Sequence, residues 1–436
     1  MQITRGYRAE LDLNNKQITA CKQHAGAARY AYNWGLRRKQ EVYQATGKSI
    51  RAMELHRELN QLKQTELPWM YEVSQCAPQE ALRDLDGAFN NFFRRVQLKK
   101  EGKWKGPPGY PTFKSKKKGC GSFRLTGAIH VFEKAVQLPR LGRLRLKEQG
   151  YLPTSGVKIL SATVSEQAGH WFVSIQVIEN VPDPVPATGE PIGVDLGINS
   201  LAVCSDDREP ITNPKALRTH LGKLIRTQRR FSRRQKGGKN REKARKLLAR
   251  QHSRIATIRR NALHQATSYL AHAHLSKTEL ATYHSKLAST LPEAKTKVEA
   301  KVKRRLVKRL LHQATQANAA RRPQVIVLED LNVASMVKNP KLARAISDVG
   351  MGEFRRQMEY KTAWNGETLL IANRFYPSSK RCSACGNIKA ALSLSERVYV
   401  CELETCQAVM DRDFNSALNL AELAREQTEY REFLGN

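Results

Sequence analysis

Half of the chain's eight cysteines form two close pairs, and their spacing is the strongest local constraint on folding in this sequence. Two residues separate Cys382 from Cys385, four separate Cys401 from Cys406, and 15 residues lie between the pairs. Each pair can present two thiolates to the same ion, so the spacing is typical of a tetrahedral structural zinc site. The alternative is four reduced or disulfide-bonded cysteines without a metal. The second spacer is wider and is followed by Gln407 where the first pair has a glycine, which leaves the geometry of that turn open.

The net charge of the chain limits the kind of molecule that it is expected to bind. The 436 residues include 75 Lys and Arg against 40 Asp and Glu, a net charge of +35. Such an excess repels itself unless a polyanion neutralises it, and nucleic acid is the polyanion that we expect. A membrane surface is less favoured, because the basic residues form several separate blocks and no apolar run is long enough to cross a bilayer. The N-terminus lacks the apolar core of a signal peptide, which predicts a reducing compartment.

The N-terminal half reads as a β domain with a helical insertion. Residues 2–13 alternate between apolar and polar side chains and predict a strand. Short apolar runs separated by Gly and Pro over residues 120–180 predict a small β domain. Because the helices lie between these two parts, residues 1–18 are expected to pair back with the later strands. The helical patterns cover residues 19–47, residues 49–64 and a third segment from Pro78, whose aromatic stripe we interpret as helix-bundle core.

A basic segment over residues 98–119 follows the third helix. It holds eight lysines, one glutamate, four glycines and three prolines, together with three aromatic residues. The glycines and prolines argue against a helix. We interpret the segment as a mobile clamp on a nucleic-acid backbone, because lysines neutralise phosphates and rings stack on bases. A solvated linker is the alternative. The candidate contacts are Lys103, Lys105, Lys116 and Lys117.

A second basic block extends over residues 218–260, with 17 Lys and Arg and one acidic residue. Apolar residues recur at helical spacing, and the pair Gly237-Gly238 divides the block into a predicted hairpin of two helices. A face of one sign of charge suits a phosphate backbone, whereas a merely solvated helix would mix both signs. The candidate contacts are Arg226, Arg229, Arg230, Arg233 and Arg234.

Carboxylates follow two apolar strands that are far apart in sequence. After a predicted domain boundary over residues 181–191, a short buried strand ends in Asp195. A second one ends at Leu328 and is followed by Glu329. Asp413, at the start of the final amphipathic helix, is the third. Three such carboxylates can hold two divalent cations about 4 Å apart for phosphodiester cleavage. The alternative is three unrelated capping residues.

Five motifs taken together resemble the TnpB family, the RNA-guided nucleases encoded by bacterial insertion sequences and related to the type V CRISPR effectors. The resemblance covers roughly residues 190–420, whereas the N-terminal half is similar only in the order of its elements and in charge. The motifs are, in order, GVDLGINSLAV, VIVLEDLNVASMVKN, LARAISDVGMGEFRRQMEYK, FYPSSKRCSACG and DRDFNSALNL.

The resemblance implies an α/β multi-domain fold. Its parts are a RuvC-like nuclease domain of the RNase H fold with a zinc ribbon, and an N-terminal wedge β-barrel with an inserted helical recognition domain. Residues 272–320 form a longer connection than the family pattern, with no assigned role. The implied boundaries are 1–18 and 106–185 for the barrel, 19–105 for the recognition domain, 190–381 and 407–436 for the nuclease domain, and 382–406 for the ribbon.

Carried over by motif, Asp195, Glu329 and Asp413 are expected to be catalytic and to bind two Mg²⁺ ions. Asp411 is the runner-up for the third position. The four paired cysteines are expected to bind one structural Zn²⁺. The resemblance further implies a guide RNA from the transposon end, a double-stranded DNA target next to a short motif, and a bacterial cytoplasmic, nucleoid-associated location without a membrane. It leaves the oligomeric state open.

The sequence leaves three other functions open. A compact type V CRISPR effector would use the same chemistry with an RNA from a repeat array. A protein-only transposase would use the same acids for strand transfer. A nuclease-dead RNA-guided repressor is disfavoured by the intact carboxylates, because a cluster of like charges is costly without a metal.

Overall fold

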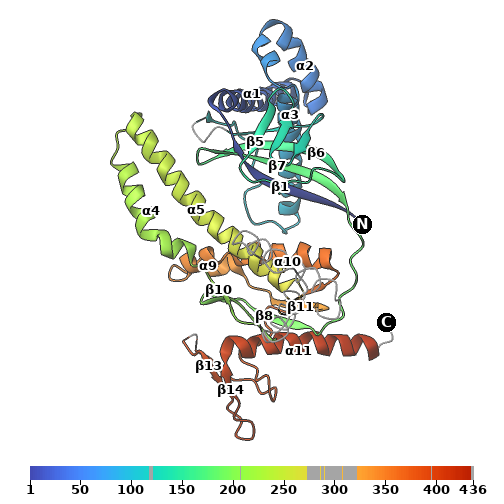
Figure 1. Cartoon of the computed structure of the whole chain (residues 1–436), viewed down its shortest axis with the longest axis vertical. Coiled ribbons are helices and arrows are strands. Elements are labelled where there is room, and N and C mark those ends of the chain that lie inside the picture. Colours follow the sequence, from blue (N-terminus) through green and yellow to red (C-terminus); the bar gives the residue numbers. More distant parts are fainter. Residues whose placement is uncertain are drawn as a thin grey trace. The chain divides into compact units, whose positions relative to one another are not determined.

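A computed structural model describes residues 1–116, 121–206, 208–272, 322–393 and 395–433, with the single residues 285, 289 and 307 (Figure 1). The chain divides into two compact units. The N-terminal unit is Met1–Pro182 with Arg245–Arg250, and the C-terminal unit is Asp183–Ala244 with Gln251–Asn436. The division after Pro182 falls within the predicted boundary segment. Lys117 and most of the long connection lie outside the described residues. No helix among the described residues is long and apolar enough to cross a membrane.

The N-terminal unit contains a seven-stranded sheet in the order β2-β6-β7-β1-β5-β4-β3. The first strand pairs antiparallel with β7 from Gln2 to Leu11 and reaches β5 at its end, which confirms that the N-terminus pairs with the later strands. Its inward residues, among them Ala9 and Leu11, are buried. The strands are β1 (Gln2–Asp12), β2 (Ser122–Leu125), β3 (His130–Phe132), β4 (Ala135–Leu138), β5 (Gly142–Leu146), β6 (Val157–Gln167) and β7 (His170–Asn180).

Helices of the N-terminal unit follow the predicted order. The side chain of Asn14 accepts a hydrogen bond from the backbone N–H of Gln17, so a capping box starts the first helix. Gly47, in the left-handed region at φ 67°, ends it. At Gly35 a Cβ would lie 2.6 Å from Cδ2 of Leu82 in the third helix, so the Leu82 side chain packs directly on the backbone of the first helix. The helices are α1 (Asn15–Thr46), α2 (Ala52–Thr65), η1 (Pro68–Glu72) and α3 (Cys76–Lys100).

The aromatic stripe of α3 is core over only part of its length. Leu82 and Leu85 are fully buried, as predicted, whereas Phe93 is 58% exposed. The ring of Tyr110, from the basic segment, packs edge-on against Phe89 with 5.5 Å between centroids. The interpretation of the whole stripe as bundle core is therefore wrong at its C-terminal end, where the basic segment supplies the covering ring.

The basic segment begins inside the helix. Because α3 ends at Lys100, the prediction of no helix is wrong for residues 98–100, and the chain leaves the helix before the first glycine of the segment. Two contacts tie the following loop to α3: Arg95 Nη1 donates to the carbonyl oxygen of Pro108 at 3.4 Å, and its guanidinium lies 5.4 Å from the ring of Trp104. The described part of this segment is thus held against the helix.

A five-stranded sheet in the order β10-β9-β8-β11-β12 organises the C-terminal unit. Strands β8, β11 and β12 run parallel, β9 is antiparallel to β8, and β10 is antiparallel to β9. The predicted strands at 192–195, 200–204 and 325–328 are confirmed. The strands are β8 (Ile192–Asp195), β9 (Ser200–Cys204), β10 (Ile211–Thr212), β11 (Val325–Glu329) and β12 (Thr368–Ala372).

Helices cover both faces of this sheet (Figure 1). Along β11, Ile326 and Leu328 pack on one side with residues of α5, α9 and α10, while Val327 packs on the other with Leu420 of α11. A parallel strand buried on both faces explains the continuous apolar run in the sequence. The helices are α5 (Lys239–Leu270), α8 (Val333–Met336), α9 (Ala343–Val349), α10 (Met351–Asn365) and α11 (Arg412–Phe433).

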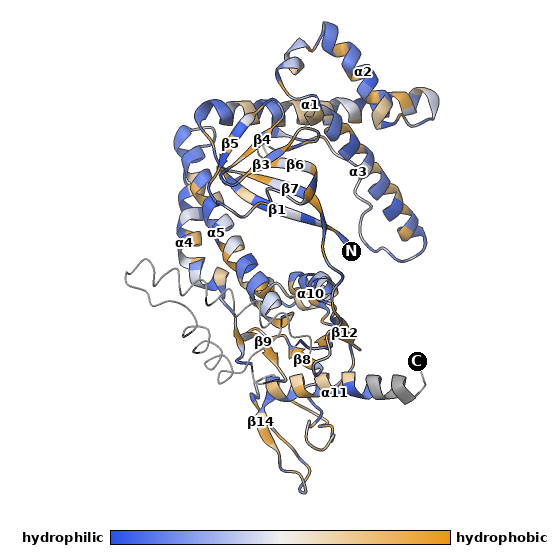
Figure 2. Cartoon of the chain, turned by 45° about the vertical axis from the view of Figure 1, so that its right-hand side comes forward, coloured by the Kyte–Doolittle hydropathy of each residue, from blue (hydrophilic) through white to orange (hydrophobic). Residues whose placement is uncertain are grey.

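The predicted break at Gly237-Gly238 is confirmed. Helix α4 (Ala216–Ser232) ends before it, and Gly238 is the residue preceding the first turn of α5. From α5, Arg241 Nη1 donates to the carbonyl oxygens of Phe231 at 3.0 Å and Arg234 at 2.7 Å, which satisfies the carboxyl end of α4. Figure 2 shows both helices as mainly hydrophilic.

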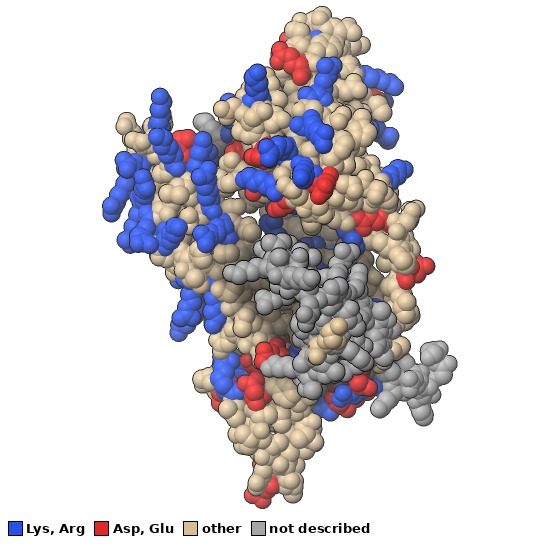
Figure 3. Space-filling view, in the orientation of Figure 1, with Lys and Arg blue, Asp and Glu red and all other residues tan. Residues whose placement is uncertain are grey.

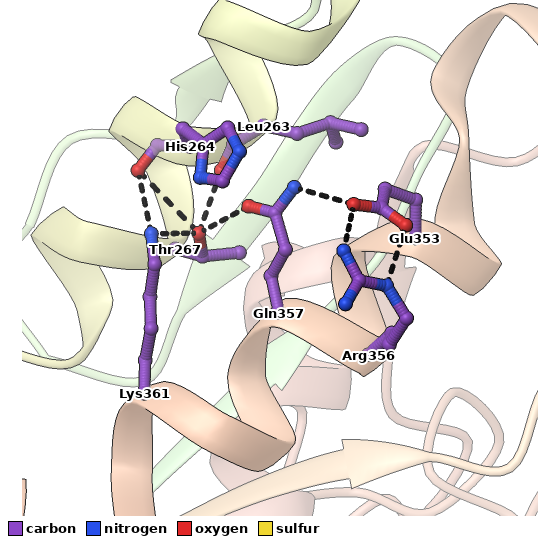
Figure 4. A network of polar contacts seen from close by, with 7 residues as sticks. All are labelled: Leu263, His264, Thr267, Glu353, Arg356, Gln357 and Lys361. Atoms are coloured by element: carbon purple, nitrogen blue, oxygen red, sulfur yellow. Dashed lines mark hydrogen bonds and ion pairs between the residues drawn. The ribbon is translucent and has the colours of Figure 1, made fainter. Parts of the chain in front are cut away.

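A polar network around the buried side chains of Thr267 and Gln357 joins α5 to α10 (Figure 4). Thr267 Oγ1 accepts a hydrogen bond from Lys361 Nζ at 2.7 Å and donates to Gln357 Oε1 at 2.9 Å. The Nε2 of Gln357 donates to Glu353, which also pairs with Arg356. These charge-assisted contacts hold the pKa of Glu353 at about 2. The network fixes the register of the two helices above the sheet.

Candidate metal centres and nucleic-acid surface

Two of the predicted carboxylates leave adjacent parallel strands side by side. Leu328 of β11 is paired with Val194 of β8, so the next residues along each strand are Glu329 and Asp195. Both therefore stand at the carboxyl ends of their strands. The order of the strands reverses between β8 and β11. The chain continues from β8 to β9 on one side of this point and from β11 to β12 on the other. Ligand sites in open α/β sheets occur at such a switch point.

The third predicted carboxylate comes to the same end through a close helix–strand contact. A Cβ at Gly193 would lie 2.0 Å from the carbonyl oxygen of Ala417, so only glycine lets α11 pack directly on β8. One turn before Ala417, Asp413 is in the first turn of the helix. Ser416 Oγ donates to Asp195 Oδ1 at 3.3 Å, which shows that this turn faces the end of β8.

Electrostatics link these carboxylates. Burial raises the pKa of Asp195 well above its ordinary value, and the negative charges of Glu329 and Asp413 raise it further. Glu329 accepts a hydrogen bond from the hydroxyl of Ser378, and Asp413 forms a 3.1 Å ion pair with Arg412. Carboxylates whose negative charges repel one another are stabilised when a divalent cation binds between them, and carboxylate oxygens are ligands that such cations prefer.

The two candidate aspartates in the motif DRD have different partners. Asp411 is exposed, and its Oδ1 accepts hydrogen bonds from the backbone N–H groups of Asp413 at 2.9 Å and Phe414 at 3.0 Å. It thus caps the amino end of α11. The charge of Asp413, by contrast, acts on half-buried Asp195. This arrangement favours Asp413 over Asp411 as the third ligand.

Two residues that orient the carboxylates were not foreseen. Ser378 and Ser416 both lie inside the quoted motifs, yet a serine has no spacing rule that marks it as a partner of a distant acid. Ser378 is 49 residues from Glu329, and Ser416 is 221 residues from Asp195. Only the fold brings these pairs together.

The four paired cysteines form one cluster. The Sγ atoms of Cys382, Cys385, Cys401 and Cys406 all lie within 4.8 Å of one another. The separations are 3.8 Å for Cys382 with Cys406 and 3.6 Å for Cys385 with Cys401. Four thiolates at about 2.3 Å from a tetrahedral zinc ion are about 3.8 Å apart. A disulfide needs about 2.05 Å, and all four thiols are free. The cluster therefore fits zinc and excludes the disulfide alternative.

The second cysteine pair, with its wider spacer, ends in the same type of turn as the first pair. The N–H of Gly386 donates to the carbonyl oxygen of Cys382 at 2.8 Å, and the N–H of Gln407 donates to that of Leu403 at 3.1 Å. Both residues have positive φ, 77° and 47° respectively. Leu403 thus takes the place that Cys382 has in the first turn. Cys401 lies two residues earlier, just after β13 (Val398–Val400), which pairs with β14 (Val409–Asp411).

Basic side chains gather on α4 and α5 (Figure 3). All five candidate arginines, three in α4 and two directly after it, are exposed, and they line one groove of about 450 Å³. Among the described residues, no ion pair with a carboxylate involves them. Of the lysines predicted to bind nucleic acid, Lys105 and Lys116 are exposed, and Lys103 forms a 3.0 Å ion pair with Glu101. The arginines that line this groove are Arg226, Arg229, Arg230, Arg233 and Arg234.

Three family profiles match parts of the chain. Residues 172–278 match OrfB_IS605, described as "Probable transposase". Residues 352–420 match the "Cas12f1-like, TNB domain", which includes all four clustered cysteines. Residues 1–48 match a "Helix-turn-helix domain", although the structure there consists of β1, one continuous helix α1 and the short turn that follows it.

Whole-length relatives agree with these matches. A Streptomyces pristinaespiralis protein is 33% identical over 423 residues, 96% of this chain and 89% of its own. One from Escherichia coli strain K12 is 27% identical over 440 residues, 96% of this chain and 92% of its own. Both are named "Putative RNA-guided DNA endonuclease", the second with InsQ added. Among solved structures, the "mini-RNA-guided endonuclease CRISPR-Cas_phi3" is a weak likeness, with a TM-score of 0.41 and 9% identity over 97% of this chain and 92% of its own.

The fold and the cysteine cluster define a mixed α/β multidomain protein with a zinc-ribbon-like element. The relative at 33% identity spans nearly the whole chain and decides the family. The chain belongs to the TnpB family of IS605 OrfB proteins.

Proposed function

We propose that this protein is an RNA-guided DNA endonuclease of a transposable element. It cuts double-stranded DNA by metal-dependent phosphodiester hydrolysis. The observation that carries the proposal is the placement of Asp195, Glu329 and Asp413 at one end of the C-terminal sheet, where the charges of the other two act on half-buried Asp195. The names of the relatives supply the RNA guide and the DNA substrate.

The residues present suit two Mg²⁺ ions. The three carboxylates would hold them, and bound ions of this kind activate a water molecule and stabilise the leaving oxygen in phosphodiester cleavage. Around them, Ser378 orients Glu329 and Ser416 orients Asp195 by hydrogen bonds. Arg412 is paired with Asp413, and its guanidinium is the kind of group that binds a phosphate.

The domain assignments extend this proposal. Residues 190–381 and 407–436 form the RuvC-like nuclease domain, interrupted by the zinc ribbon of residues 382–406. Residues 1–18 and 106–185 form the wedge domain, and residues 19–105 the recognition domain. The mixed sheet covered by helices on both faces supports the first assignment, and the strand pairing of the N-terminus with β7 supports the second.

The RNA bound by the purified protein tests the guided mechanism. The protein is expressed from its native locus, purified, and the RNA that accompanies it is sequenced. We expect one discrete species that runs into the end of the transposable element. Repeat-spacer RNA would assign the protein to a CRISPR effector, and the absence of any defined RNA would favour a protein-only transposase; either result overturns the proposal.

The arginines of α4 are proposed to bind phosphates. Three Arg→Gln changes, at Arg226, Arg229 and Arg230, should weaken nucleic-acid binding. They should also flatten the plot of log binding constant against log salt concentration by about 2 to 3, because each lost phosphate contact removes about 0.9 from the slope. Fluorescence anisotropy with a labelled duplex over a salt series measures both quantities.

A control variant separates location from net charge. Arg38, Arg145 and Arg425 each pair with a carboxylate on their own surface, so changing all three to Gln removes the same positive charge. Exposed pairs of this kind contribute little to stability. An unchanged slope in the α4 variant, or an equal change in the control variant, would show that the α4 arginines do not contact phosphates.

A further inference from the structure

A pocket in the N-terminal unit is formed by residues other than the carboxylates and the clustered cysteines. It has a volume of about 570 Å³ between α1 and η1, within the range of small-ligand sites. Its walls include the rings of Tyr30 and Trp69, which contact each other edge to face at 5.7 Å between centroids. Tyr30 and Trp69 are 39% and 40% exposed, so part of their surface is accessible to a ligand. Ala27 and Val73 form its buried apolar floor.

The pocket is open because a helical residue has no side chain. Gly26 lines it in the middle of α1, where glycine weakens a helix. A Cβ at Gly26 would meet nothing within 4 Å, so no packing contact requires a glycine there. Gly35 on the same helix differs, because its Cβ would collide with Leu82. Any larger residue at position 26 would project into the open space that the pocket provides.

The surroundings of the pocket are basic. Arg37 lines it and is exposed, and one acidic residue, Glu72, also lines it. Asn33, another lining residue, holds the backbone of Lys114 through two hydrogen bonds of 2.7 and 2.9 Å. The basic loop is therefore attached to the rim of the pocket. Apolar rings inside and positive charge at the rim are complementary to a base and its flanking phosphates.

We propose that this pocket holds one unstacked nucleobase of a single-stranded segment of the bound nucleic acid. The base stacks on Trp69 or Tyr30, and Arg37 and the lysines of the attached loop meet the phosphates beside it. The inference rests on the proposed function, because it requires a nucleic-acid partner. RNA and DNA share the chemistry of base and phosphate, and the experiment distinguishes them.

Ultraviolet cross-linking of the purified ribonucleoprotein tests the site, first alone and then with an added single-stranded DNA oligonucleotide. After nuclease and trypsin digestion, mass spectrometry locates nucleotide adducts. We expect adducts on the peptide of residues 30–37 or on the peptide that carries Trp69, and their mass identifies a ribonucleotide or a deoxyribonucleotide. Gly26→Leu should fill the pocket and lower the yield of these adducts at least fivefold, and Gly26→Ala should lower it less.

Gly87→Leu is the matched control, because Gly87 also lies in a helix where a Cβ meets nothing within 4 Å, but outside the pocket. Equal adduct yields in the Gly26→Leu and Gly87→Leu proteins would overturn the proposal. Adducts confined to other peptides would also overturn it while leaving nucleic-acid binding intact. Adducts on no peptide at all would contradict the proposed function as well.

Discussion

Changing Asp195 to alanine is expected to lower DNA cleavage by at least about 10³-fold, which corresponds to about 4 kcal/mol in the barrier. The reason is that the charges of both other carboxylates act on the half-buried side chain of Asp195. RNA and DNA binding should be nearly unchanged, because the basic side chains are not altered. A cleavage assay and a binding assay on the same preparation measure both effects. Full cleavage by this variant would remove the two-metal hypothesis.

The same substitution at Asp413 and at Asp411 tests which of the two aspartates is the third ligand. Asp413→Asn removes a charge next to Asp195 and should abolish cleavage. Asp411→Asn removes the same charge, but asparagine caps a helix as well as aspartate does, so α11 and cleavage should both persist. If Asp411→Asn is the inactive protein and Asp413→Asn the active one, the third ligand has been assigned to the wrong residue.

Changing Cys382 to serine is expected to release zinc and to unfold the region around the two cysteine pairs. Structural zinc contributes roughly 10 kcal/mol or more to small modules, and the hydrophobic cluster around Tyr399 is too small to replace it. Elemental analysis should give one zinc ion per wild-type chain and none in the variant. Limited proteolysis should cut the variant within residues 382–411.

Cys76→Ser is the matched control for the zinc prediction. Cys76 is a free thiol outside the cluster, and its Sγ lies 3.4 Å from the carbonyl oxygen of Thr126, a contact that a hydroxyl can keep. This variant should retain its zinc ion and resist the protease. An undiminished zinc content in Cys382→Ser would mean that the ligand set is different from the one proposed.

Sequence predicted those parts of the fold that short-range patterns encode. Apolar runs ending in acids gave β8 and β11, and the Gly237-Gly238 pair gave the break between α4 and α5. The return of β1 to the later strands followed from the order of elements alone. The cysteine spacing gave the cluster, because its ligands lie in two short segments that each fold locally.

Features that depend on approach between distant segments were not predictable. The contact that requires Gly193 arises only when α11 packs on β8, and no spacing in the sequence announces it. Asp411 and Asp413 carry the same side chain, so their separate roles emerge only from where α11 begins. The exposed end of the α3 stripe was missed because helical periodicity does not tell how far a core extends, and Phe93 lies beyond it.

Exchanging the guide segment of the bound RNA tests most directly whether the protein is an RNA-guided endonuclease. The RNA that accompanies the purified protein is replaced by versions whose guide segment matches either of two plasmid sites, and cleavage is mapped with Mg²⁺ present. We predict that the cut moves with the guide segment and disappears with Asp195→Ala. Cutting at the same place whatever the guide, or cutting without RNA, would contradict an RNA-guided endonuclease.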